Sequence, residues 1–207
     1  MAPQHPGAHL RSQFGDIDIY LFDQILRGRF DARSSVLDAG CGDGRNLIYF
    51  LQRGFTCYGV DEDPAAIHVM RTTAARLAPG LPPEHFTVAS VERLPYSDSS
   101  MQAVLSSAVL HFARDETHWE RMVQEMWRVL APSGIFFARL ASNIGIESLV
   151  GPARRVVRLP DGSDRFLVDE AMLLGWTGRL GGRLADPIKT TNVQQQRCMT
   201  TWCVVKA

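Results

Sequence analysis

Apolar residues recur along the chain with two different spacings, which predict an alternation of strands and helices. Short apolar runs bounded by turn residues are typical of strands buried in a sheet, and the last two runs alternate apolar with polar positions. We expect seven strands, at residues 36–37, 56–61, 86–89, 102–108, 135–140, 188–194 and 196–206.

Between the strands, apolar residues three or four positions apart predict helices. Asp63 followed by Pro64 is a typical helix start, and Asp115 and Asp169 can cap two others. Residues 1–13 are expected to be disordered. The alternation of helix and strand implies a parallel sheet with right-handed crossovers. We expect helices at residues 16–26, 47–51, 64–77, 116–130 and 169–176.

The first strand leads into a turn that contains Gly40, Gly42 and Gly44, and a helix follows. Glycines there permit positive φ angles and let a ligand approach the backbone. A dinucleotide-binding turn has the spacing G-x-G-x-x-G, whereas here the third glycine comes one residue early. Asp38 and Asp43 would also place carboxylates beside a pyrophosphate. A ligand with positive charge and a single carboxylate, such as S-adenosylmethionine (SAM), fits this turn better.

Asp61 ends the second strand, 19 residues after Gly42. In folds of this type, an acid about 20 residues after the glycine turn hydrogen-bonds ribose hydroxyls. The alternative is an acid that is merely solvated at a strand end. The glycine turn upstream favours the nucleoside role.

Residues 36–46 followed by Asp61 resemble motif I and the acidic loop of the class I SAM-dependent methyltransferases. Residues 94–98 and the fourth strand extend the resemblance, which covers residues 36–141. The run 41–46 is also similar to that of small bacterial tellurite-resistance methyltransferases and their thiol-directed relatives.

This resemblance implies a fold and a domain organisation. The fold would be α/β and Rossmann-like: a seven-stranded, mostly parallel sheet with an antiparallel last hairpin and helices on both faces. Residues 1–207 would form one domain, in which residues 1–30 supply a lid or flanking helix, with Tyr20 as the lid candidate. Residues 142–168, which have a turn-rich centre, would form a hairpin inserted on the substrate side.

The resemblance also assigns parts of the cofactor to residues of this chain. Asp38 would hold the ammonium of SAM and Asp61 the ribose hydroxyls. Where the family often has an aspartate that binds adenine, this chain has Ser90, which can accept a hydrogen bond without charge. For Glu92 the alternative is a surface acid. The residues expected to bind SAM, and S-adenosylhomocysteine (SAH) as the product, are Asp38, Gly40, Cys41, Gly42, Asn46, Asp61, Glu62, Ser90, Val91, Glu92 and Ser107.

His111 follows the fourth strand at the carboxyl edge of the sheet, where ligands bind in open α/β folds. It is the best candidate for a general base, and the alternative is a histidine that packs against the cofactor. An acceptor that is already anionic would need no base, whereas a hydroxyl or amine would. His118, in the first turn of the next helix, is expected to be exposed.

Composition narrows the classes of function and location. The formal net charge of the 207 residues is zero, which argues against a sequence-independent grip on nucleic acid. No apolar stretch approaches the roughly 18 residues of a membrane span, and the N-terminus resembles no signal peptide. The four cysteines follow no metal or disulfide spacing. A cytoplasmic monomer or homodimer without a metal site is therefore expected.

From residue 151 onward, nine Lys and Arg residues stand against five Asp and Glu residues. This excess predicts either a basic pocket for an anionic substrate or a solvated hairpin.

The sequence thus predicts SAM-dependent methyl transfer to a small-molecule acceptor, such as a thiol, a metalloid or another soft nucleophile. The alternatives are a SAM-binding protein without transferase activity and an NAD-dependent oxidoreductase. The glycine spacing and Asp38 disfavour the oxidoreductase.

Overall fold

The computed structural model describes residues 6–31, 34–150 and 155–207, with side chains from Leu10 onward. A mixed sheet forms its centre. The strands are β1 (Ser35–Ala39), β2 (Thr56–Asp61), β3 (Phe86–Val88), β4 (Met101–Ser107), β5 (Leu130–Ser142), β8 (Gly182–Leu184), β9 (Lys189–Val193) and β10 (Arg197–Lys206). Their order is β3-β2-β1-β4-β5-β10-β8, and β9 also pairs with β10.

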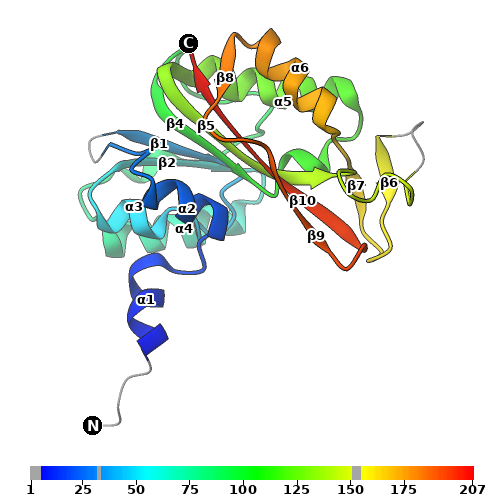
Figure 1. Cartoon of the computed structure of the whole chain (residues 1–207). Helices are drawn as coiled ribbons and strands as arrows, with labels where there is room; N and C mark the ends of the chain where they lie inside the picture. Colours follow the sequence, from blue (N-terminus) through cyan, green and yellow to red (C-terminus); the bar gives the residue numbers. More distant parts are fainter. Residues whose placement is uncertain (1–5, 32–33, 151–154) are drawn as a thin grey trace.

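Helices cover both faces of this sheet (Figure 1). The α-helices are α1 (Pro6–Phe14), α2 (Ile19–Leu26), α3 (Ile48–Gln52), α4 (Pro64–Leu77), α5 (Glu116–Val129) and α6 (Glu170–Arg179), and two short 3-10 helices are η1 (Pro83–His85) and η2 (Leu110–Phe112). Helices α5 and α6 pack on one face, and α2, α3 and α4 pack on the other.

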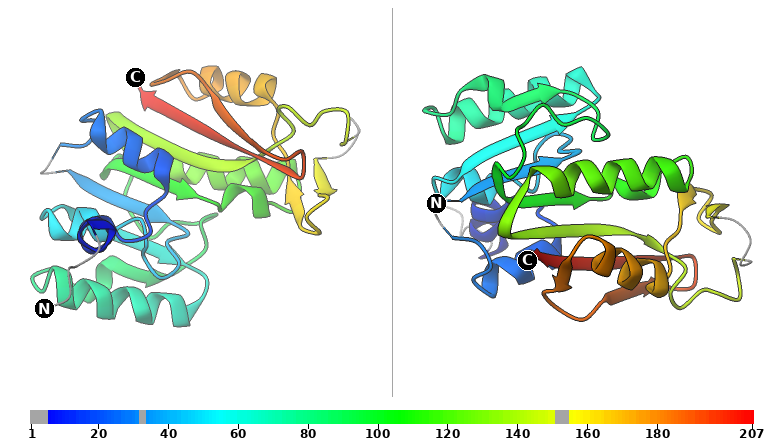
Figure 2. Two further views of the ribbon diagram at one scale, coloured as in Figure 1. Left: turned by 60° about the horizontal axis from the view of Figure 1, so that its bottom comes forward. Right: turned by 90° about the horizontal axis from the view of Figure 1, so that it is seen from above.

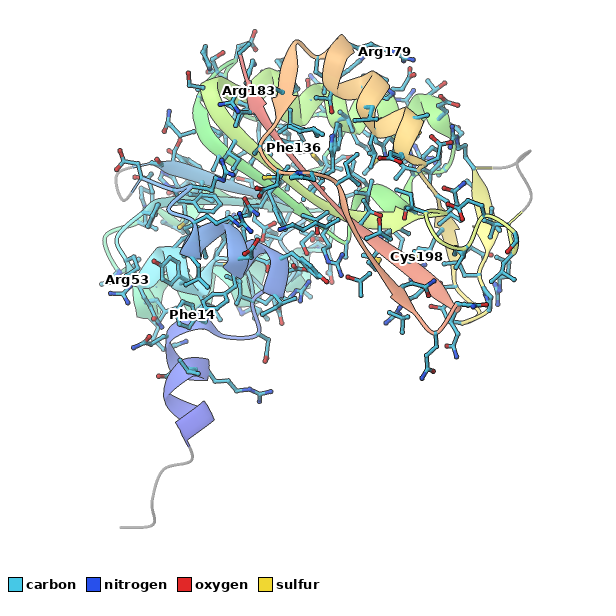
Figure 3. All side chains as sticks on the ribbon, in the orientation of Figure 1. Phe14, Arg53, Phe136, Arg179, Arg183 and Cys198 are labelled. Carbon is cyan, nitrogen blue, oxygen red and sulfur yellow. The ribbon has the colours of Figure 1, made fainter. Side chains whose placement is uncertain are left out.

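Alternate residues of the central strands fill the two cores, because successive side chains of a strand point to opposite faces. Phe136 and Trp202 lie in the core beneath α5 and α6, with ring centroids 5.4 Å apart. Their chain neighbours Phe137 and Cys203 lie in the core beneath α2, α3 and α4. Figure 3 labels Phe136 near the middle of the sheet.

The predicted mixed sheet is confirmed. The pairs β1–β2, β1–β4, β2–β3 and β4–β5 are parallel, and β10 runs antiparallel to β5 and to β9. The capping aspartates Asp63, Asp115 and Asp169 each accept a backbone N–H at the start of their helices, as predicted.

One strand was not predicted. Strand β8 follows α6 and pairs with the end of β10, so the sheet has eight strands rather than seven. Its first residue, Gly182, lies so close to the sheet that a Cβ atom would come within 2.5 Å of Val204 and 2.8 Å of Trp127. Gly182 therefore permits close packing of this strand against β10 and Trp127.

The N-terminal segment also differs from its prediction. Residues 6–13, expected to be disordered, form α1 together with Phe14, while residues 1–5 lie outside the described residues. The ring of Phe14, labelled in Figure 3, lies 4.7 Å from that of Phe22 in α2 and 5.3 Å from that of Tyr49 in α3. These tertiary contacts hold a segment whose own sequence carries little helix signal.

The predicted hairpin lies between β5 and α6. Strands β6 (Val156–Arg158) and β7 (Asp164–Phe166) pair antiparallel and form a separate two-stranded sheet. Residues 151–154, within the predicted insertion, lie outside the described residues. Figure 2 shows the hairpin beside the tip of the β9–β10 pair, at one end of the molecule. In the part of the chain that the structure describes, no helix combines the length and the apolar character needed to cross a bilayer.

Gly44 and Gly54 offer a matched test of packing at the glycine turn. Both have positive φ angles, of 86° and 79°. A Cβ atom on Gly44 would lie 1.9 Å from the sulfur of buried Met70, whereas one on Gly54 would meet nothing within 4 Å. We expect Gly54→Ala to lower the free energy of unfolding by about 1–2 kcal/mol and Gly44→Ala by about 1–3 kcal/mol more. Urea unfolding measures both losses, and equal losses would mean that Met70 makes room without cost.

Candidate active site

The glycine turn is held against the end of β2. The N–H groups of Gly40 and Cys41 both donate to the carbonyl of Val60, at 2.8 and 2.9 Å. A Cβ atom on Gly40 would lie 2.4 Å from Val109, so this position has no room for a larger residue. Gly42, with a φ of 52°, instead faces open space. A ligand can therefore approach the backbone at Gly42.

Asp61 ties the two βα units together. One carboxylate oxygen accepts the N–H of Gly42 at 2.9 Å, and the other accepts the N–H of Asp63 at 3.0 Å. A carboxylate oxygen can accept more than one hydrogen bond, so both oxygens keep capacity for hydroxyl donors. Asp61 thus supports the turn and faces the cavity beside it.

Asp38 is a buried acid beneath the same turn. It is 1% exposed, and among the described residues neither of its oxygens has a hydrogen-bond partner of good geometry. Burial, and then the charge of Asp61, raise the pKa of Asp38 to about 7, although nearby Arg45 and Asn46 lower it. An unpaired buried carboxylate is costly, so this position favours a cationic ligand.

A cavity of about 380 Å³ opens beside the turn at the carboxyl edge of the sheet. Six predicted site residues line it, namely Gly40, Gly42, Asp61, Glu62, Ser90 and Val91. The sequence did not predict the rest of the wall, which is formed by Ala108, Val109, Phe112, Arg114, His118 and Met122. These residues come from α5 and from the segment between β4 and α5, which includes η2, and no local pattern specifies their approach to the turn.

Four predicted residues lie around the turn without lining this cavity: Asp38, Cys41, Asn46 and Ser107. The Cys41 thiol is buried, which raises its pKa, and its sulfur lies close to Gly59, where a Cβ atom would be 3.0 Å away. The side-chain oxygen of Asn46 accepts the N–H of Asp18 at 3.0 Å. Cys41 and Asn46 therefore support the turn from behind.

The expectation that His118 is exposed is wrong. Its side chain is buried, and both ring nitrogens have partners there. Nε2 donates to Glu92 at 2.7 Å, and Nδ1 accepts the N–H of Arg114 at 3.0 Å. Glu92 also pairs with Arg114 and Arg121, each at 3.2 Å, and does not line the cavity. Glu92 thus fastens α5 beside the cavity, and His118 forms part of the wall.

A second polar cluster joins α2 to the sheet edge. The Ser107 hydroxyl donates to Asp18, which caps α2, and accepts from Arg45, both at 3.3 Å. Arg139 of β5 lies 3.5 Å from the Asp18 carboxylate and 4.1 Å above the ring of Tyr20. The sequence did not predict Asp18, Arg45 or Arg139, although Arg45 directly follows the turn. Tyr20 also hydrogen-bonds Thr191, so in this structure the lid candidate is anchored at β9.

A second cavity, of about 320 Å³, adjoins the first and shares Ala108 and Phe112 with it. His111 lines this second cavity and is buried. Burial, and then the positive charge of Arg165, lower the pKa of His111 to about 4. The imidazole is therefore neutral at neutral pH.

A mostly parallel sheet with a glycine turn after β1, an acid after β2 and a cavity at the carboxyl edge defines a nucleoside-binding α/β protein. Residues 37–138 match a family model described as a methyltransferase domain. The uncharacterized methyltransferase YodH of Bacillus subtilis is 34% identical over 113 residues, which cover 55% of this chain and 42% of that protein. The 2-heptyl-1-hydroxyquinolin-4(1H)-one methyltransferase of Mycobacteroides abscessus is 33% identical over 131 residues, covering 63% and 56%.

A solved structure with the same fold is the 1,6-didemethyltoxoflavin-N1-methyltransferase of Burkholderia thailandensis, which contains bound SAH. It superposes with a TM-score of 0.69 and 17% identity, over 98% of this chain and 83% of that one. These matches and the motifs together make the chain similar to the class I SAM-dependent methyltransferases, with a methyltransferase domain matched over residues 37–138. The chain spans about half the length of the curated relatives it matches.

The raised pKa of Asp38 predicts that this residue lowers the free energy of unfolding as the pH rises, and Asp38→Asn should remove this loss. In the cofactor-free folded chain the carboxyl keeps its proton up to about pH 7, whereas in the unfolded chain it releases it near 3.8. The folded state therefore binds more protons between these values, so this group lowers the free energy of unfolding as the pH rises from about 4 to about 7.

We expect Asp38→Asn to gain about 2 kcal/mol of stability relative to wild type between about pH 5 and about pH 8, because one pKa unit is worth about 1.4 kcal/mol. Urea unfolding of both proteins at the two pH values measures this gain. Other titrating groups, such as His111, cancel in the difference. A difference that stays constant with pH would contradict the raised pKa.

Proposed function

We propose that this chain binds SAM along the glycine turn and the first cavity and transfers the methyl group to a small-molecule acceptor. The observation that carries the proposal is the position of Asp38, a buried carboxyl group without a hydrogen-bond partner of good geometry among the described residues, next to the turn and to Asp61. SAM presents an ammonium and a sulfonium in its methionyl part, and such a cation would offset the cost of the Asp38 charge.

The other contacts of SAM follow from the wall of the first cavity. The free acceptor capacity of Asp61 suits the two ribose hydroxyls, and open space at Gly42 lets the methionyl part approach the backbone. Ser90 and Val91 would bind adenine, with Glu62 beside it. Arg45, which follows the turn and acts electrostatically on Asp38, would pair with the methionyl carboxylate.

Methyl transfer from a sulfonium is an in-line displacement in which the acceptor bonds to the methyl carbon and SAH leaves. The cofactor is already activated, so the protein has to position the acceptor and exclude water. Neutral His111, in the neighbouring cavity, is a weak base because its pKa is lowered to about 4. This favours a thiol, a metalloid or another soft nucleophile that reaches the site already deprotonated.

Two further observations support the proposal. The Mycobacteroides relative and the Burkholderia structure are both named for a small-molecule acceptor, a hydroxyquinolinone and a didemethyltoxoflavin. All four cysteines are free and buried, which fits the reducing conditions of a cytoplasmic location.

Calorimetry with SAM, SAH and NAD, followed by an assay for SAH release over a panel of small acceptors, tests the function. We expect SAM and SAH to bind, and SAH to accumulate with at least one thiol or other soft nucleophile. Binding of SAM without methyl transfer to any acceptor would favour the SAM-binding alternative. Binding of NAD without SAM would contradict the proposal.

Asp61→Asn and Asp43→Asn form a matched pair for the ribose contact. Both remove one carboxylate charge near the turn, but Asp43 is exposed and lies outside the cavity wall. We expect Asp61→Asn to weaken SAM binding by about 10- to 100-fold, the scale of hydrogen bonds to a charged group. Asp43→Asn should change the affinity by less than about threefold.

Isothermal titration calorimetry measures both affinities. Because Asp61 also accepts two backbone N–H groups, thermal unfolding of the cofactor-free variants serves as the control for the turn. Unchanged SAM affinity in a folded Asp61→Asn variant would refute the ribose contact.

A further inference from the structure

The hairpin β6–β7 lies beside the tip of β9–β10 (Figures 1 and 2), and residues of both line the second cavity. Arg165 comes from β7 and Arg197 from the start of β10, and both line the cavity. The cavity shares Ala108 and Phe112 with the proposed SAM site, so a molecule bound in it would lie next to the cofactor.

Arg165 differs from the other arginines described in the hairpin region. Arg155 pairs with Asp169 at 2.6 Å, and Arg158 pairs with Asp164 at 2.8 Å. Arg165 donates to the backbone carbonyl of Asp164 at 2.7 Å and lies 4.8 Å above the ring of Phe112. Within the described residues, no carboxylate comes within 4.0 Å of its guanidinium nitrogens, so its charge faces the cavity without a paired acid.

Asp161 is the one acid in the described wall of this cavity. One of its oxygens accepts both the N–H and the hydroxyl of Ser163, at 3.0 and 2.6 Å. The other lies 3.5 Å from Arg197, a loose ion pair. The Ser163 hydrogen bonds, and then the charges of Arg197 and Arg165, lower the pKa of Asp161, so it is ionised. One carboxylate thus opposes two arginines, and the wall carries one net positive charge.

The remaining wall is largely apolar. Ala141, Leu159 and Met199 contribute aliphatic surface, and Phe112, which is 59% exposed, lies at the junction with the first cavity. His111 is neutral, and its buried Nδ1 has no hydrogen-bond partner among the described residues. An apolar wall with one uncompensated cation and one unpaired ring nitrogen suits a ligand with an apolar body and a single anionic group.

We propose that this second cavity binds a small organic acid with an aromatic or aliphatic body, whose carboxylate pairs with Arg165 and Arg197 while another group of the same molecule accepts the methyl. The inference rests on the proposed function, because it identifies the cavity as the acceptor site of the methyl transfer. The excess of Lys and Arg after residue 150 allowed either a basic pocket for an anionic substrate or a solvated hairpin, and the inference favours the basic pocket. A solvated Arg165 would extend into water, whereas here it lies over Phe112, where the aromatic face holds it.

Paired probes of equal shape test the charge preference. The carboxylates benzoate and 2-naphthoate are compared with their neutral amides, benzamide and 2-naphthamide, by calorimetry on the full chain saturated with SAH. We expect at least one carboxylate to bind about tenfold or more tightly than its amide, the scale of a charge-assisted hydrogen bond. This preference should weaken as salt is added, because Arg197 is exposed.

Arg165→Gln and Arg158→Gln are the matched variants, since both neutralise one arginine of the same hairpin and only Arg165 lines the cavity. Arg165→Gln should bring carboxylate and amide to within about threefold of each other, and Arg158→Gln should keep the wild-type preference. The inference is overturned if neither carboxylate is preferred over its amide, or if Arg165→Gln retains the preference.

SAH titration separates this inference from the proposed function. If SAH binds and no carboxylate preference exists, the anion site is wrong and the cofactor site stands. If SAH does not bind, while the carboxylate preference depends on Arg165, the cavity is an anion site and the proposed methyl transfer fails.

Discussion

The candidate site depends on the register between β1 and β2. Asp38 lies opposite Gly59 and Ala39 opposite Val60, so the glycine turn and Asp61 emerge at the same level. The bond from the Gly42 N–H to the Asp61 carboxylate follows from that level. The same register buries Asp38 below the turn, where its oxygens have no hydrogen-bond partner of good geometry among the described residues. The fold thus carries an electrostatic cost that a cationic ligand would relieve, in the way that functional sites hold strain.

Segments from the first and last thirds of the chain meet at the carboxyl edge of the sheet, beside the glycine turn. Helix α2 is fixed there by Asp18, which bonds Ser107 and pairs with Arg139, and Tyr20 bonds Thr191 of β9. The hairpin β6–β7 and the β9–β10 tip form the neighbouring cavity. Ala108 lines both cavities, with a φ of 64° that is unusual for a residue with a Cβ. A small side chain at this junction leaves the two cavities adjacent.

Much of the fold could be predicted because its signals are local. The helix over 64–77 begins and ends where predicted. Asp63 and Pro64 mark its start, and the helical spacing of its buried apolar residues indicates how far it extends. The β8 strand and α1 were missed because both depend on tertiary contacts. Gly182 belongs to a strand because it packs closely against Val204 of β10. Phe14 belongs to α1, which is held by the contacts of its ring with Phe22 and Tyr49.

The sequence by itself determined the glycine turn, the acids on either side of it and the resemblance to the methyltransferases, because these features lie within about 25 consecutive residues whose spacing reflects one βαβ unit. Only the tertiary structure decided which distant residues complete the site. It buried His118 against Glu92 and brought Arg165 and Arg197 around one cavity. The physical reason is that burial, pKa and charge pairing depend on neighbours from other elements, which no local pattern in the sequence specifies.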